Sequence, residues 1–116
     1  MQVSYRQFRA GIFTSWEDML AGVAQFGSSI GRSALLAITQ SEDKDGAVAT
    51  VWYRADTDAK EAALDFRIFR GGWLTSWDQV CNEAAEFASQ IGPDRIASIS
   101  QSEDKADGLV VIWYWV

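Results

Sequence analysis

The pentapeptide Gln-Ser-Glu-Asp-Lys occurs at residues 40–44 and again at residues 101–105. Adjacent carboxylates of this kind can bind a hard cation, move a proton or hold a basic protein. Neighbouring residues on a strand point to opposite faces, so each pair does not readily converge on one ligand. We favour a structural interpretation, an acidic hairpin end that resists aggregation. Contact with a partner is the alternative, through Glu42, Asp43, Glu103 and Asp104.

A second candidate site combines an arginine, a glycine and a serine just before each expected helix. These residues are Arg9, Gly11 and Ser15 in the first copy and Arg70, Gly72 and Ser76 in the second. Backbone amides at a helix N-terminus bind anions, so the pattern predicts an anion pocket. The Gly-Lys-Ser/Thr ending of a phosphate-binding loop is missing. A glycine required by a tight strand-to-helix turn explains the same residues, and we favour that reading.

Six tryptophans in a chain of 116 residues could form stacking platforms for a ligand or a partner. Four of them fall on expected helix faces or strands, where a large ring contributes packing: Trp16, Trp52, Trp77 and Trp113. Trp73 and Trp115 have no tryptophan at the matching position of the other half. We therefore expect these two to be the exposed contacts.

The composition excludes several classes of function. Histidine is absent, which removes the commonest general base and metal ligand, so we expect no catalytic residue, metal ion or cofactor. The net charge of −6 repels nucleic acid and anionic lipid, so neither is an expected partner, whereas a basic protein is compatible. The sequence has no apolar run of about 18 residues and no signal-peptide pattern, which predicts a cytoplasmic protein.

The chain is a tandem duplication. Residues 5–53 align with residues 66–114 without gaps, and the pentapeptides, Thr-Ser-Trp and Trp-Tyr recur at matching positions. We expect one domain, 1–116, made of two repeats at about 1–54 and 62–116 with a polar connector at 55–61.

Each repeat is predicted to be βαββ. A partly alternating strand precedes a serine cap, Ser15 or Ser76, and an apolar helical stripe follows the cap. Thr14 with Glu17 is an alternative cap, one residue earlier. Gly31 and Gly92 stand where a helix ends in the left-handed conformation. Two strands complete each repeat, at 35–39 and 48–53 in the first copy and at 96–100 and 109–116 in the second.

The hairpins leave two registers open, because the Asp-Gly pair comes one position later in the second repeat. If Asp-Gly makes both turns, Trp52 faces Thr39 while Trp113 faces Ser102. The alternative is a longer second loop with a bulge and no shift.

A repeat of about 50 residues hides too little surface to be stable alone, so the two should share a core. We expect an α+β fold with one mainly antiparallel six-stranded sheet, both helices on one face and an internal pseudo-twofold axis. The last strand, 109–116, is apolar on both faces, which indicates that both are covered. A sheet-against-sheet homodimer would supply that cover.

These features predict a non-catalytic binding or protein-interaction module. One alternative is an acidic inhibitor or immunity-type protein that masks a basic partner site. Others are binding of a small ligand and a carboxylate-based enzyme, with the carboxylate beside Arg9 or Arg70.

Overall fold

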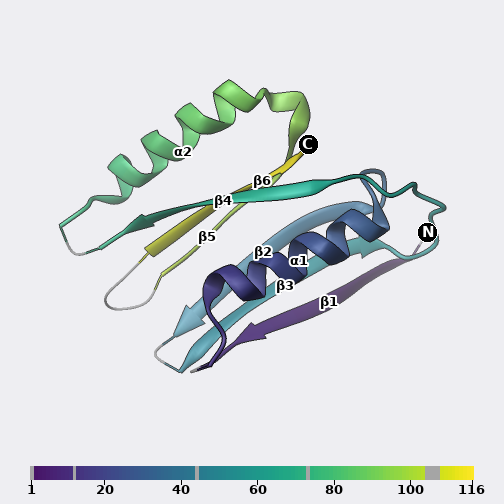
Figure 1. Cartoon of the computed structure of the whole chain (residues 1–116), viewed down its shortest axis with the longest axis horizontal. Coiled ribbons are helices and arrows are strands. Elements are labelled where there is room, and N and C mark those ends of the chain that lie inside the picture. The colour runs from purple at the N-terminus through teal and green to yellow at the C-terminus, as the bar shows by residue number, and fades with distance from the viewer. Residues whose placement is uncertain (1, 12, 44, 73, 104–107) are drawn as a thin grey trace.

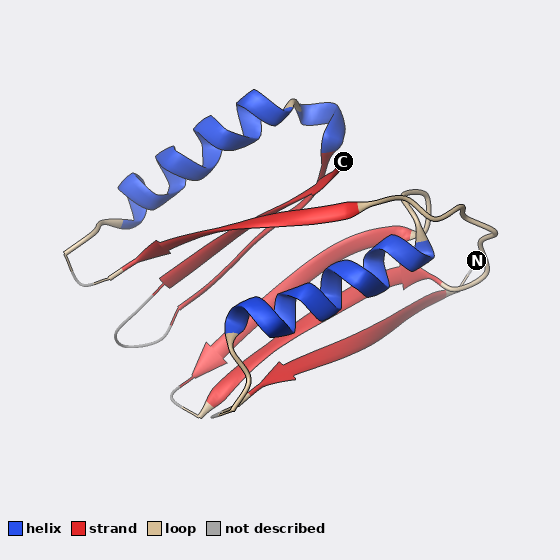
Figure 2. Cartoon of the chain, viewed as in Figure 1, coloured by secondary structure: helices blue, strands red, loops and turns tan. Residues whose placement is uncertain are grey.

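The computed structural model describes residues 2–11, 13–43, 45–72, 74–103 and 108–116. Both repeats have the predicted βαββ order, which confirms an α+β fold (Figures 1 and 2). The elements are β1 (Val3–Ala10), α1 (Trp16–Ile30), β2 (Leu35–Asp43), β3 (Gly46–Arg54), β4 (Leu64–Gly71), α2 (Trp77–Ile91), the 3-10 helix η1 (Pro93–Arg95), β5 (Ile96–Glu103) and β6 (Gly108–Trp115).

Both helices begin and end where the sequence predicts. The hydroxyls of Ser15 and Ser76 each accept a hydrogen bond, at 3.1 Å, from the backbone amide three residues later. Gly31 (φ 85°) and Gly92 (φ 103°) follow the helices and are the described residues with positive φ. Glycine therefore ends each helix in a conformation that other residues rarely adopt.

The strands form two antiparallel three-stranded sheets, and the expected single six-stranded sheet is wrong. Sheet A has the order β1-β3-β2 and sheet B the order β4-β6-β5. At the junction, the Ser98 hydroxyl accepts a hydrogen bond from the Ile38 amide and donates one to the Ile38 carbonyl, each at 3.2 Å. The free edge of β2 thus meets side chains on a face of β5, so the backbone ladder does not continue from one sheet to the other.

The helices lie on opposite faces of sheet B, so the expectation of both helices on one face is also wrong. Figure 1 shows α1 against sheet A and α2 on the far side of sheet B; α1 also contacts β4, and β2 lies along β5. Phe66 and Trp113 belong to a core with α1 and sheet A, whereas Phe69 and Ile112 pack with α2. One face of sheet B therefore packs on α1 and the β2 edge of sheet A, and its other face packs on α2.

Strand β6 is covered on both faces, as its unbroken apolar sequence predicts. Val111 and Trp113 face the core with α1, and Val110 and Ile112 face α2. All four are buried. Because the chain itself supplies both covers, this strand gives no reason to expect a second chain.

The repeats do not have the expected pseudo-twofold relation. A twofold perpendicular to one sheet, with both helices on one face, would make the junction strands antiparallel. Strand β2 instead runs parallel to β5, because residues 38, 40 and 42 bond to residues 98, 100 and 102 in ascending order.

The two hairpins have equivalent registers, so the shifted-register prediction is wrong. Trp52 pairs with Ala37, and Trp113 pairs with the matching residue, Ser98. In the first hairpin Asp43 pairs with Gly46, so the turn falls one residue before Asp-Gly. The alternative of a longer second loop concerns residues 104–107, which lie outside the described residues.

No helix in the described part of the chain is long and apolar enough to cross a membrane. The cytoplasmic location expected from the sequence stays a prediction.

The two helix-ending glycines provide a matched test of the packing of the connector against the end of α1. A Cβ added at Gly31 would lie 2.0 Å from the Lys60 carbonyl oxygen, whereas one at Gly92 would meet nothing within 4 Å. We expect Gly92→Ala to cost about 1–2 kcal/mol of unfolding free energy, from backbone conformation alone. Gly31→Ala should cost at least about 1–2 kcal/mol more, because backbone must also move. Urea unfolding followed by circular dichroism measures both losses, and equal losses would contradict this packing.

Candidate functional site

Sheet A has one face that α1 does not cover, which we call the free face. The cross-strand register forms three rows on this face that include all three strands, β1, β3 and β2. The rows are Tyr5, Trp52 and Ala37; Gln7, Thr50 and Thr39; and Arg9, Val48 and Ser41. The opposite face carries the apolar residues that pack with α1. Alternation along each strand therefore separates a buried side from an outward side of mixed character.

An aromatic pair forms the centre of the first row. The rings of Tyr5 and Trp52 lie 5.6 Å apart between centroids, with 40° between their planes. Tyr5 is 58% exposed and Trp52 is 39% exposed. The Trp52 Nε1 donates a hydrogen bond to the Thr39 hydroxyl at 3.2 Å, which holds the indole against the sheet. The pair thus presents ordered aromatic surface to solvent.

Sheet B contains the same arrangement in a buried state. Phe66 and Trp113 lie 5.2 Å apart at 42°, and the Trp113 Nε1 donates to the Ser100 hydroxyl at 3.2 Å. Trp113 is 0% exposed because this face packs into the core with α1 and sheet A. The two repeats therefore have matching aromatic faces, of which the one in sheet B is covered and the one in sheet A is open.

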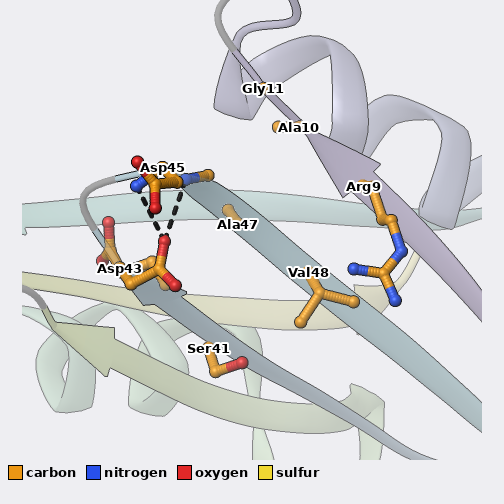
Figure 3. Close-up of a pocket in the computed structure, with 10 residues that line it drawn as sticks. Arg9, Ala10, Gly11, Ser41, Asp43, Asp45, Ala47 and Val48 are labelled. Atoms are coloured by element: carbon orange, nitrogen blue, oxygen red, sulfur yellow. Dashed lines mark hydrogen bonds between the residues drawn. The ribbon is translucent and has the colours of Figure 1, made fainter.

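A pocket of about 450 Å³ at the hairpin end of sheet A brings members of both predicted sites together (Figure 3). Arg9 and Gly11 lie on its β1 side, with Glu42 and Asp43 on its β2 side. Figure 3 shows Val48 between the Arg9 guanidinium and the Asp43 carboxylate. The oppositely charged groups line one opening without converging on a common point.

The local bonds of these groups explain their positions. Asp43 Oδ1 accepts hydrogen bonds from the Asp45 and Gly46 amides, at 2.8 and 3.1 Å. Arg9 donates to the Gln7 side-chain oxygen at 3.2 Å. Asp43 therefore stabilises its own hairpin turn, as the structural interpretation of the pentapeptide predicts.

The other pentapeptide carboxylates also have bonds inside the molecule. The Ser102 hydroxyl donates to Glu42 at 3.2 Å, across the junction of the repeats. The Trp77 Nε1 donates to Glu103 at 3.0 Å. Asp104 lies outside the described residues. The Ser102–Glu42 bond joins the two pentapeptides, but Glu42 and Glu103 bond to different partners, so these bonds support a structural role.

Side chains of the predicted anion pockets form hydrogen bonds or an ion pair within the protein. Ser15 and Ser76 use their hydroxyls as helix caps. Arg70 forms an ion pair with Glu17 on α1 of the other repeat. A Cβ at Gly11 or Gly72 would meet nothing within 4 Å, and neither residue has positive φ. The expectation that the turns require these glycines is therefore wrong.

The tryptophans differ from expectation in a way that identifies the free face. Trp115, expected to be exposed, is 5% exposed and packs in the core. Trp73 lies outside the described residues. Trp52, assigned to packing from the sequence, lies in the first row of the free face and is 39% exposed. The sequence does distinguish the open face, because Gln7 and Thr50 are polar whereas the matching residues of sheet B, Ile68 and Val111, are apolar.

Two observations concern the ionisable groups of the described residues. No group of three or more cysteine, aspartate or glutamate side chains among them could hold a metal ion. Burial, and then the nearby Asp65 carboxylate, raises the pKa of Tyr114 above its ordinary value. Tyr114 therefore remains a neutral donor, 3.4 Å from that carboxylate.

Comparison with protein-family models, curated proteins and solved structures finds no match for this chain. Its function must therefore be argued from its own residues. The free face and the hairpin pocket each join residues from several strands.

Asp43 offers a test of the structural interpretation. We expect Asp43→Ala to cost about 1 kcal/mol of unfolding free energy, because two turn amides lose their acceptor. Asp43→Asn keeps an acceptor oxygen and should stay within about 0.5 kcal/mol of wild type. Urea unfolding at neutral pH compares the two. An asparagine variant as unstable as the alanine variant would show that the charge, and not the acceptor, matters.

Proposed function

We propose that this protein is a non-catalytic protein-interaction module that binds its partner with the free face of sheet A. The exposed Tyr5–Trp52 pair is the observation that carries the proposal. Tyrosine and tryptophan dominate the energetics of protein interfaces, because they bury a large area at little cost in side-chain entropy.

The second repeat supports a protein as the ligand. Its matching face, centred on Phe66 and Trp113, packs against protein, namely α1 and sheet A. On the free face the aromatic pair lies next to side chains that can form hydrogen bonds, such as Gln7 and Thr39. Such a surface suits a broad protein contact, which has an apolar core and a polar rim.

The other functions considered from the sequence have weaker support. An acidic inhibitor would present carboxylates to a basic site, yet Glu42, Asp43 and Glu103 each accept a hydrogen bond within the chain. An enzyme would place a carboxylate as base beside Arg9 or Arg70. A carboxylate does lie beside Arg70, that of Glu17, but these two side chains form an exposed ion pair, 46% and 61% exposed. Arg9 bonds to the uncharged side chain of Gln7.

Photo-cross-linking tests the free face directly. A benzophenone amino acid at Gln7, which is exposed beside Tyr5, is irradiated in the cells that produce the protein. We expect cross-linked products that disappear when Tyr5→Ser and Trp52→Ser are added, because the aromatic pair holds the partner.

The same probe at Glu86, an exposed residue of α2, is the matched control. The products should be absent there. Identical products at both positions, or products that persist without the aromatic pair, would overturn the proposal.

A further inference from the structure

The contact between the repeats has two complementary sides. One side is the face of sheet B around Trp113, with the serines of β5. The other is the strip of β2 beside α1, where Ile38 is 1% exposed. The Gln40 side chain accepts a hydrogen bond from Ser100 at 2.6 Å and donates one to Ser102 at 3.0 Å. Apolar burial and polar pairing thus join a face of sheet B to the side of the first repeat formed by α1 and β2, which we call the helix-and-strand side.

The helix-and-strand side occurs a second time, beside α2, where the described residues leave an opening. An opening of about 330 Å³ there is lined by Trp77, Cys81, Gln101, Ser102 and Glu103, and we call it the α2 groove. Next to it on β5, Ile99 is 58% exposed although it matches the buried Ile38. Cys81 is likewise exposed where the matching Leu20 is 0% exposed.

The sheet side also occurs a second time, as the free face. Trp52 and Tyr5 match Trp113 and Phe66, and Thr39 and Ser41 match the serines that bond to Gln40. The free face belongs to sheet A, and the α2 groove belongs to α2 and β5 of the other repeat. Trp52 on the free face and Ile99 beside the groove are both exposed, so the two surfaces do not cover one another within the chain.

Charge is complementary between the two unused sides. An ion pair between Arg70 of β4 and Glu17 of α1 spans the contact between the repeats. The residues at the matching positions are Arg9 and Asp78, and both are exposed. They carry the same charges in the same order, so a copy of the contact would bring them together.

We propose that the protein associates with itself head to tail, with the free face of one copy seated against the α2 groove of the next. This inference rests on the proposed function, because it names a second copy as the partner of the free face. The new contact reproduces the one between the repeats, with Trp52 in the role of Trp113 and Ile99 in the role of Ile38.

Such a contact joins two different surfaces, so it either closes into a ring or extends as a chain. It differs from a sheet-against-sheet dimer, in which each copy uses the free face alone. Damage to the α2 groove separates these arrangements, because only head-to-tail association depends on it.

Sedimentation velocity over a concentration series, with two single variants, tests the inference. Trp52→Glu damages the free face and Ile99→Glu damages the α2 groove. Both side chains are exposed, so each chain should fold, and circular dichroism verifies this. Val116→Glu adds a charge at another exposed apolar residue and is the matched control.

We expect the wild type and the control to associate, and each variant alone to associate at least about tenfold more weakly. A mixture of the two variants should form a 1:1 heterodimer, because each supplies the surface that the other lacks. In that mixture the Cys81 thiol of the Trp52→Glu chain should react more slowly with a maleimide than that of its partner.

A wild type that stays monomeric, an Ile99→Glu chain that associates normally, or a mixture that stays monomeric would each overturn the inference. The proposed function and this inference can fail independently. If the wild type is monomeric while the probe at Gln7 still captures a different protein through Tyr5 and Trp52, the free face binds a partner but not a second copy.

Discussion

The structure depends on one packing constraint: α1 must cover two sheets. A repeat of about 50 residues cannot hide enough apolar surface alone, and here the second repeat places the face around Trp113 and Leu64 against the first. Gly27 permits the approach, because a Cβ there would lie 2.5 Å from a Leu64 methyl carbon. The Ser28 hydroxyl accepts a hydrogen bond from the Leu64 amide at 2.9 Å, which ties the helix to β4.

This constraint makes two similar repeats unequal. Sheet B has protein on both faces, whereas sheet A has α1 on one face and an open aromatic pair on the other. The same inequality leaves Ile99 exposed and Ile38 buried. The contact between the repeats uses one sheet face and one helix-and-strand side. The matching free face and α2 groove stay open, and these are the surfaces with which we propose the protein binds.

The sequence predicts the local structure well, because local structure follows from local chemistry. Serine caps, helix-ending glycines and apolar periodicity locate the helices, and the duplication assigns one topology to both halves. How the sheets meet depends instead on bonds such as that between Ser98 and Ile38, far apart in the chain. Trp52 and Trp113 likewise share their flanking pattern, so only the polarity of Gln7 and Thr50 beside Trp52 distinguished the open face.

The contact between α1 and β4 is the most direct test of this account. Nuclear Overhauser effects measured on the isotopically labelled protein should connect the α protons of Gly27 with the methyl groups of Leu64. If Leu64 shows such effects only to neighbours within sheet B, α1 does not cover both sheets. The two repeats would then be separate units, and the inequality between their faces would have no physical basis.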